Sequence, residues 1–312
     1  MNRIEKFGIK SIGTYLPQTR RSNIEHNKKF FQLPEDFILQ KIGVESIAVS
    51  GTVENVVSMC MGAMKDLVQN NSIDLSGVDA IILVTQNPET TIPHNSAMLH
   101  EALGLGPKVA CFDVSQGCAG YIYGLSIVTS FLESNNFNNA LLFTCDPYTK
   151  IVNASDQNTS LIFGDGASVS WISKDAVYYP KSFHFGIMPN STNKLTMKDG
   201  HLFMDGRAIF NFVLKFVVPD MRNCLLQDNQ TVDSIDSFLF HQGSKYILDH
   251  IAKLLEIPTE KIVYEMKQYG NLVSSSIPFL LKNFFLNQKN TLFLSGFGVG
   301  LSWGSVILEH KR

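Results

Sequence analysis

Short runs of consecutive apolar residues recur along the chain, separated by segments in which apolar residues repeat every three or four positions. The runs at residues 80–84, 110–114, 140–144, 237–240 and 291–295 have the length and composition of strands buried on both faces of a sheet. The segments between them have the periodicity of amphipathic helices. This alternation predicts an α/β fold in which helices cover both faces of the sheets.

A weak internal repeat relates the two halves of the chain. Residues 55–86 read as a helix, a connection and a strand, and residues 211–242 read in the same order. Asp79 and Asp236 start the equivalent strands, and Asn139 and Asn290 start a second matching pair. Because the two matches occur in the same order, we expect a duplicated α/β unit.

Composition narrows the class of protein without identifying a partner. Hydrophobic residues make up 45% of the 312 residues and charged residues 17%, which excludes disordered and fibrous proteins. The 26 basic and 28 acidic residues give a net charge of -2, so we expect neither nucleic acid nor an anionic membrane as a partner. No apolar run reaches the roughly 20 residues of a membrane span, and no secretory signal is apparent near Met1.

The five cysteines are widely spread and form no CxxC pair, and no histidine stands near them at the spacing of a zinc site. This pattern suits a reducing compartment, so we expect a soluble cytoplasmic protein without a bound metal. At most one of the cysteines is expected to react.

Cys118 stands in FDVSQGCAGYIYGL, residues 112–125, where a buried strand ends and a helix begins. Unpaired amides and the helix dipole stabilise an anion at such a position. We therefore expect the pKa of this thiol to be lowered and its thiolate to act as a nucleophile. Ala119 and Gly120 leave space for a substrate beside the sulfur. A buried cysteine often serves only as a small apolar side chain, and for Cys118 taken alone that alternative stays open.

Two further polar residues stand at ends of predicted elements. His241 comes directly after the strand at 237–240, and Asn271 follows Gly270 just before a run of small hydroxyl residues. A histidine at the carboxyl end of a strand is well placed for chemistry, whereas a Gly-Asn pair also suits a plain turn and a helix cap. Neither residue identifies a reaction by itself.

The segment LSGFGVGLSWGSVIL, residues 294–308, places glycines at 296, 298, 300 and 304 after a buried strand. Glycines let backbone amides approach a ligand closely, as an oxyanion hole requires. We do not expect a dinucleotide-binding fingerprint, because no βαβ unit follows the segment. A papain-like protease is also disfavoured, since no aromatic residue immediately follows Cys118 and the glycines would be unexplained.

Together these motifs resemble the beta-ketoacyl-acyl carrier protein synthase III family, which has the thiolase fold. The resemblance runs the whole length of the chain, through IKSIGTYLP from residue 9, DVSQGCAG from 113, IFGDGAS at 162–168, HQG from 241, YGN from 269 and GFGVGLSWGS from 296. It implies a duplicated five-layered α-β-α-β-α architecture with a five-stranded sheet in each half, which we place at residues 1–172 and 173–312. It also implies a homodimer formed through the N-terminal half.

The resemblance implies a catalytic triad of Cys118, His241 and Asn271, as in the initiating synthases. Cys118 would take an acyl group from a thioester, with the backbone amides of Cys118 and Val299 as the oxyanion hole. A malonyl thioester would then lose carbon dioxide, and its enolate would be held by His241 and Asn271. Attack on the acyl-cysteine would give a 3-ketoacyl thioester, and neither a metal nor a redox cofactor is implied.

Residues at the expected substrate entrance depart from the family's pattern. Phe37 and Gln157 stand where the best-known members have a tryptophan and an arginine that enclose the adenine of coenzyme A. Lys41 keeps a positive charge where a pyrophosphate contact would lie. Losing the arginine removes a cation–π contact, so thioesters of acyl carrier protein become more favoured substrates than those of coenzyme A.

Other residues are assigned by resemblance to the surroundings of the site. Phe297 and Gly298 are expected beside the nucleophile, and the segment from Ile92 to His94 is expected to line the acyl pocket and the dimer interface. Lys245 and Lys253 are candidate docking residues for an acidic carrier protein, or simply part of a solvated helix face.

Two alternatives to the condensing synthase stay open. The first is an acyltransferase that passes the acyl group from Cys118 to an amine or a hydroxyl without decarboxylation. The second is a non-catalytic partner subunit of another ketosynthase, against which the complete triad argues.

Overall fold

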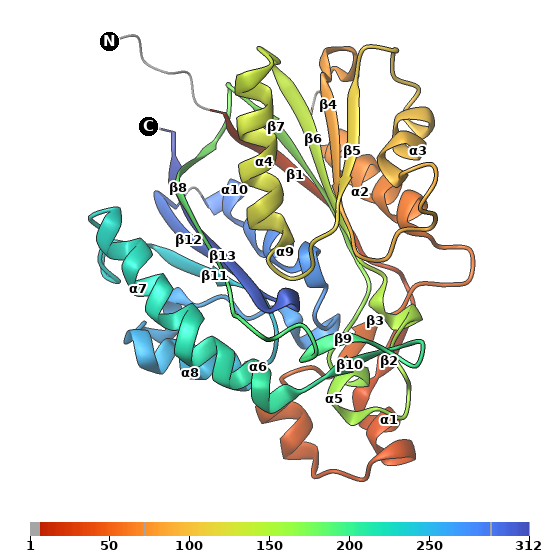
Figure 1. Cartoon of the computed structure of the whole chain (residues 1–312), viewed down its shortest axis with the longest axis vertical. Coiled ribbons are helices and arrows are strands. Elements are labelled where there is room, and N and C mark those ends of the chain that lie inside the picture. Colours follow the sequence, from red (N-terminus) through yellow and green to blue (C-terminus); the bar gives the residue numbers. More distant parts are fainter. Residues whose placement is uncertain (1–6, 72, 288, 312) are drawn as a thin grey trace.

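The computed structural model of the chain describes residues 7–71, 73–287 and 289–311. In these residues a mixed sheet has nine strands in the order β11-β12-β13-β8-β1-β7-β6-β4-β5 (Figure 1). Its strands are β1 (Gly8–Tyr15), β4 (Ala80–Val84), β5 (Ala110–Val114), β6 (Asn139–Cys145), β7 (Ala167–Ser173), β8 (Tyr178–Ile187), β11 (Ser237–Phe240), β12 (Thr291–Gly298) and β13 (Ser302–His310). The five apolar runs predicted from the sequence are β4, β5, β6, β11 and β12. The prediction that 110–114 is buried is wrong, because β5 lies at the edge of the sheet and is partly exposed at every position.

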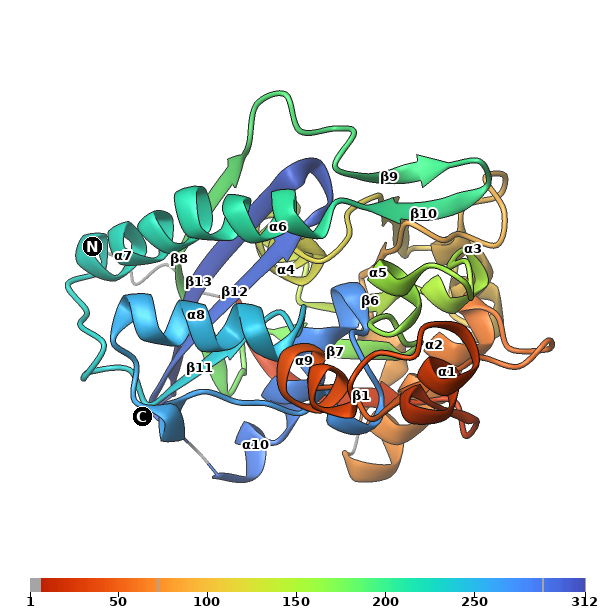
Figure 2. The ribbon, with the colours of Figure 1, turned by 90° about the horizontal axis from the view of Figure 1, so that it is seen from below.

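Helices form three layers around the two halves of this sheet. Helix α4 contacts β4 and β6 on one side and β12 and β13 on the other, and α9 likewise lies between β1 and β11. Helices α2 and α3 pack on the outer face of the N-terminal strands, while α7 and α8 cover the C-terminal ones (Figures 1 and 2). The helices are α2 (Val56–Asn70), α3 (Asn95–Ala102), α4 (Gly120–Ser134), α6 (Gly206–Phe212), α7 (Val218–Gln227), α8 (Lys245–Leu255), α9 (Ser276–Lys282) and α10 (Phe284–Asn287). The predicted five-layered α/β architecture is confirmed.

Two aspartates make the same contacts in the two halves. The Asp79 carboxylate accepts the backbone amides of Asn138 and Asn139 at the start of β6, at 2.7 and 3.2 Å. The Asp236 carboxylate accepts those of Asn290 and Thr291 at the start of β12, at 2.8 and 2.9 Å. The short repeat in the sequence therefore marks equivalent strand starts.

The two halves differ at the outer edge of the sheet. In the N-terminal half, β5 pairs in parallel with β4 over its whole length. At the corresponding position beside β11, the described residues form only one parallel bridge, between Phe238 and Ile262. The expectation of five strands in each half is therefore wrong for the C-terminal half, where the fifth strand is reduced to this bridge.

The glycine-rich segment is a β-hairpin rather than a loop. Strand β12 continues through Gly298 and pairs in antiparallel register with β13, so that Gly296 faces Gly304 and Gly298 faces Ser302. The prediction of a strand ending at residue 295 was too short. The hairpin extends because the glycines allow β12 to pass directly against the turn that carries Cys118, as the contacts below show.

Smaller elements gather at one end of the molecule (Figures 1 and 2). They are β2 (Arg20–Ser22), α1 (Asn23–Phe30), a π-helical turn (Phe37–Ile42), β3 (Ser46–Ala48), α5 (Gln157–Ser160), β9 (Leu195–Lys198) and β10 (His201–Met204). Among the residues described, no helix is both long and apolar enough to traverse a bilayer.

Candidate active site

Cys118, His241 and Asn271 line one cavity of about 360 Å³. All three side chains are buried, with exposed fractions of 3% or less. Cys118 comes from the turn between β5 and α4, His241 from the end of β11 and Asn271 from the segment before α9. The fold thus brings Cys118 together with two residues that lie more than a hundred positions further along the chain.

The sulfur of Cys118 lies against two backbone amides. It follows β5 and precedes α4, and both its own amide and that of Val299 hydrogen-bond toward Sγ. These are the two amides predicted to form the oxyanion hole. Their position allows them to stabilise an oxyanion formed beside the sulfur.

The acidity of Cys118 differs from the sequence prediction. Burial, together with the nearby carboxylate of Asp146, raises the pKa of the Cys118 thiol to about 12, while the two amides lower it only in part. The prediction of a lowered pKa is therefore wrong for the free protein. Loss of hydration on burial raises the pKa by more than the amides at the helix start lower it. The resting nucleophile is a thiol.

Gly298 brings the glycine-rich hairpin onto the nucleophile. A Cβ atom at this position would lie 2.6 Å from Cys118 Sγ, and one at Gly296 would lie 2.6 Å from the Cys118 carbonyl oxygen. No side chain fits at these distances. The glycines are therefore required by the close approach of β12 to Cys118.

His241 and Asn271 lie side by side in the same cavity as Cys118. Asn271 Nδ2 and His241 Nε2 are 3.1 Å apart. Burial lowers the pKa of His241 to about 3, so its imidazole is neutral at physiological pH and keeps one N–H donor. An amide and a neutral imidazole line the cavity without placing a charge in it; the amide donates in their mutual contact, and the imidazole donates to a ligand from Nε2 as the Nε2–H tautomer.

The segment IFGDGAS holds Asn271 in place. The Asn271 amide donates to the Ile162 carbonyl at 2.8 Å, and the Gly164 amide donates to the Asn271 carbonyl at 3.0 Å. The Asn271 side chain also accepts the Val273 amide at 2.8 Å, as in a tight turn. Asn271 therefore forms the turn expected of a Gly-Asn pair and still presents Nδ2 to the cavity.

Asp146 is a buried acid of the site that the sequence analysis did not single out. It follows β6 and accepts the Gln86 amide at 2.7 Å and the hydroxyl of Ser274, which lies three residues after Asn271. Burial raises the pKa of Asp146 to about 6. Its only sequence signal was a charged residue after an apolar strand, and that signal was too weak to separate it from other turn residues.

The predicted entrance residues divide into two groups. Phe37, Gln157, Phe297 and Gly298 line the cavity. Lys41 does not line it; its Nζ lies 4.8 Å from the centre of the Tyr246 ring. Tyr246 itself is a lining residue, so Lys41 stands behind the cavity wall.

The two lysines predicted to dock a carrier protein differ in their contacts. Lys245, at the start of α8, forms an ion pair with Asp249 at 2.6 Å. Lys253 lies in the last turn of the same helix and is exposed. A basic residue missed by the sequence analysis, Arg207 at the start of α6, lines the cavity and is exposed.

The fold and the site together define the class of protein. Two halves with matching strand starts, a cysteine before the central helix α4 and a glycine hairpin over that cysteine are the arrangement of the thiolase fold. A crystal structure of beta-ketoacyl-[acyl carrier protein] synthase III from Thermus thermophilus superposes with a TM-score of 0.90 at 25% identity, over 97% of this chain and 99% of that one.

Sequence comparison identifies the family within that class. The model for 3-oxoacyl-[acyl-carrier-protein (ACP)] synthase III matches residues 112–187, and the model for its C-terminal part matches residues 225–310. The beta-ketoacyl-[acyl-carrier-protein] synthase III of Staphylococcus saprophyticus is 30% identical over 97% of this chain and 98% of its own length. That of Geobacillus kaustophilus is 28% identical over 98% and 99%. The chain belongs to the beta-ketoacyl-[acyl-carrier-protein] synthase III family.

Proposed function

We propose that this protein catalyses the decarboxylating condensation of an acyl thioester with malonyl-acyl carrier protein, giving a 3-ketoacyl thioester. Such a product starts fatty acid synthesis or a related lipid or polyketide pathway. The observation that carries the proposal is the meeting of one thiol, two backbone amides and two neutral donors in a single cavity. This arrangement supplies a nucleophile, an oxyanion hole and an enolate site.

In the first step, Cys118 attacks the carbonyl carbon of the acyl thioester. The carbonyl oxygen becomes an oxyanion that the amides of Cys118 and Val299 stabilise. The bond to the carrier sulfur then breaks. The proton lost by the Cys118 thiol balances the proton gained by the departing carrier thiolate, so the step changes no net charge.

In the second step, the malonyl thioester loses its carboxylate as carbon dioxide. The electron pair moves into an enolate whose oxygen accepts hydrogen bonds from His241 and Asn271. The enolate carbon attacks the acyl group, the bond to Cys118 breaks, and the sulfur takes up a proton again. A neutral His241 suits this role, since decarboxylation begins from an anionic substrate that an imidazolium would hold in its ground state.

The substrate carrier is proposed from the charge at the entrance. Arg207 lines the cavity and takes part in no ion pair among the described residues, so it is available to the phosphate of a phosphopantetheine arm. Phe37 and Gln157 line the same cavity without the arginine that would stack on adenine. These features support carrier-protein thioesters over coenzyme A thioesters as substrates, with no separate cofactor.

A homodimer formed through β5 is proposed from the exposure of that strand. Strand β5 is the edge of the sheet and stays partly exposed at every position, whereas its neighbour β4 is fully buried. An exposed apolar edge strand is a template for pairing with a second copy. Ile92, 88% exposed on the loop before α3, is placed to reach such a partner.

A cytoplasmic location is proposed because all five cysteines are free thiols, including the partly exposed Cys111. Free thiols persist in a reducing compartment.

The proposed function is tested by separating its two steps. The wild-type protein and the Cys118→Ala, His241→Ala and Asn271→Ala variants are incubated with acyl-acyl carrier protein, and the intact protein is weighed. An acyl adduct is expected on all but Cys118→Ala. Malonyl-acyl carrier protein is then added, and only the wild type should release a 3-ketoacyl product.

The results distinguish the alternatives. The acylated protein could fail to react with malonyl-acyl carrier protein and instead transfer its acyl group to an amine or a hydroxyl. That result would show an acyltransferase in place of a synthase. A wild-type protein that acquires no adduct from any donor would contradict the proposal and favour a partner subunit.

A further inference from the structure

Three side chains of metal-binding types converge outside the cavity that holds Cys118. His184 lies on β8, Cys224 on α7 and Asp228 directly after α7. One ligand atom from each lies within 4.8 Å of those from the other two. No other such group of three is present in residues 7–71, 73–287 and 289–311.

The local backbone explains why the three meet. Cys224 and Asp228 are four residues apart at the end of α7, so they lie on one face of the helix. Ser182 and His184 are two residues apart on β8 and share one face of the strand. The Ser182 hydroxyl donates to Asp228 Oδ2 at 2.5 Å, which fixes the helix end against this face of β8.

The donor atoms are available for a ligand. The side chains of His184 and Cys224 make no hydrogen bond to the part of the chain that the structure describes. Asp228 has one carboxylate oxygen engaged by Ser182 and keeps the other. Hydrogen-bonded carboxylates of this kind are typical of metal sites, where the second partner orients the ligand.

The charges around the cluster favour a cation. Asp228 places a carboxylate beside Cys224, and Asp220 lies one turn earlier on the same helix. Lys181 is the nearby basic group; its Nζ donates to the Asp228 carbonyl and pairs with Glu309 at 3.4 Å. A divalent cation would relieve the repulsion between the two carboxylates and a thiolate.

We propose that His184, Cys224 and Asp228 form a binding site for one zinc ion that fastens α7 to β8. Sulfur, nitrogen and oxygen donors in one set suit Zn²⁺, which accepts all three. His184 is partly exposed, so water completes the tetrahedron. On binding, the thiol of Cys224 releases one proton to solvent and the imidazole stays neutral.

The spacing of these three residues in the sequence does not predict a metal site. His184 and Cys224 lie far apart in the chain. The expectation of no zinc site considered only cysteines and histidines close together in the sequence. The three side chains meet only because α7 packs on the C-terminal half of the sheet, where β13 pairs with β8.

The test uses a Cys118→Ala parent, which removes the thiol beside His241 as a competing ligand. The chelator-treated parent is mixed with Zn²⁺ and passed over a desalting column, and bound zinc is measured by elemental analysis. One zinc per chain is expected for the parent and for the Cys111→Ser and His201→Ala controls. Loss of binding is expected when Cys224→Ser or His184→Ala is added to the parent.

A second readout distinguishes ligation from packing. Co²⁺ bound by the parent is expected to give a thiolate charge-transfer absorption that the Cys224→Ser variant lacks. Ser182→Ala, which leaves all three ligands, should weaken zinc binding about tenfold and still give the thiolate absorption at saturating Co²⁺.

Two results would overturn the proposal. One is a parent that retains no zinc at micromolar concentration, and the other is zinc binding that persists unchanged in both Cys224→Ser and His184→Ala. Neither result bears on the proposed condensation, because the parent already lacks Cys118.

Discussion

Cys118 illustrates how burial and local backbone compete at one side chain. The turn between β5 and α4 supplies the amide environment that stabilises a negative charge, yet desolvation and the neighbouring Asp146 raise the pKa of the thiol. In the proposed reaction, the same amides stabilise the oxyanion that forms on the carbonyl oxygen of the acyl thioester when Cys118 attacks it. The arrangement therefore favours the transition state more than the resting thiolate.

At the residue scale, Gly298→Ala is expected to block acylation of Cys118. The new methyl group would stand 2.6 Å from Cys118 Sγ and 2.7 Å from Cys118 Cβ, and rotation of the sulfur would relieve only the first contact. We expect the rate of acyl adduct formation, followed by intact mass, to fall at least about a hundredfold. Gly106→Ala, where a methyl group meets open space, is the control. An unchanged acylation rate in Gly298→Ala would show that β12 does not confine the sulfur.

His241 should make the stability of the protein depend on pH. An unfolded chain protonates this histidine near pH 6.5, whereas burial lowers its pKa to about 3 in the folded protein. The stability that it contributes is therefore complete above pH 6.5 and is lost as the pH falls toward 3. The slope is up to about 1.4 kcal/mol per pH unit.

The measurement compares the free energy of unfolding in urea for the wild type and His241→Gln between pH 7 and about 4.5. The variant should lose less stability across this range. Asp146, whose pKa is raised, contributes in the opposite direction, but it is present in both proteins and cancels. Parallel pH profiles would mean that His241 is not the buried neutral group described here.

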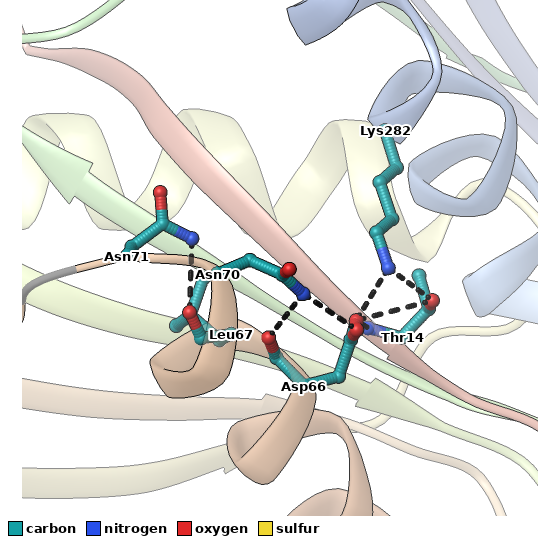
Figure 3. Close-up of polar contacts among 6 residues, drawn as sticks. All are labelled: Thr14, Asp66, Leu67, Asn70, Asn71 and Lys282. Carbon is teal, nitrogen blue, oxygen red and sulfur yellow. Dashed lines mark hydrogen bonds and ion pairs between the residues drawn. The ribbon is translucent and has the colours of Figure 1, made fainter.

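At the scale of elements, an ion pair joins the two halves beside the central layer (Figure 3). Lys282, at the end of α9, contacts the Asp66 carboxylate of α2 at 2.5 Å. The same carboxylate accepts the backbone amide of Thr14 on β1 at 2.7 Å. Asp66 thus connects a helix of the N-terminal half, the first strand and a helix of the C-terminal half.

Replacing Lys282 or Asp66 by alanine should lower the free energy of unfolding by unequal amounts. Lys282→Ala loses a partly solvated ion pair and should lower the free energy of unfolding by about 1 kcal/mol or less. Asp66→Ala also leaves the Thr14 amide without its acceptor and should cost about 1–3 kcal/mol more. Urea unfolding measures both, with Lys10→Ala as a control for an exposed pair. Equal losses would mean that the Thr14 hydrogen bond contributes nothing.

The strands that the sequence analysis did not identify share a physical feature. Strands β1 and β8 lie where the two halves meet, and glycine, serine, lysine or proline interrupts their apolar residues, so neither forms a continuous apolar run. Strand β13 was masked by its glycines and serines. Strand β7 is fully buried, yet its alternating serines likewise break the apolar run. A continuous apolar run therefore predicts a strand, but burial alone does not produce such a run.

At the scale of the whole molecule, the proposed dimer depends on the edge strand β5. A charge at its half-exposed Cys111 should oppose pairing with a second copy. Cys111→Lys is therefore expected to sediment as a monomer at concentrations where the wild type is a dimer. Val68→Lys on the outer face of α2 serves as the control. A wild type that sediments as a monomer would contradict the dimer, and a dimeric Cys111→Lys would place its interface elsewhere.

The sequence by itself determined the α/β class, five strands of the large sheet, the duplication and the family. These properties depend on local apolar patterns and short motifs, which survive without knowledge of distant contacts. It also named Cys118, His241 and Asn271, although only their motifs taken together pointed to one reaction.

Only the tertiary structure decided which polar groups meet. Packing brought Asp146 beside the Cys118 thiol, placed Arg207 at the cavity, and joined His184 to Cys224 and Asp228. Packing also set the burial that raises the pKa of Cys118 and lowers that of His241. Burial and distance arise from contacts between elements far apart in the chain, and no local pattern of residues encodes them.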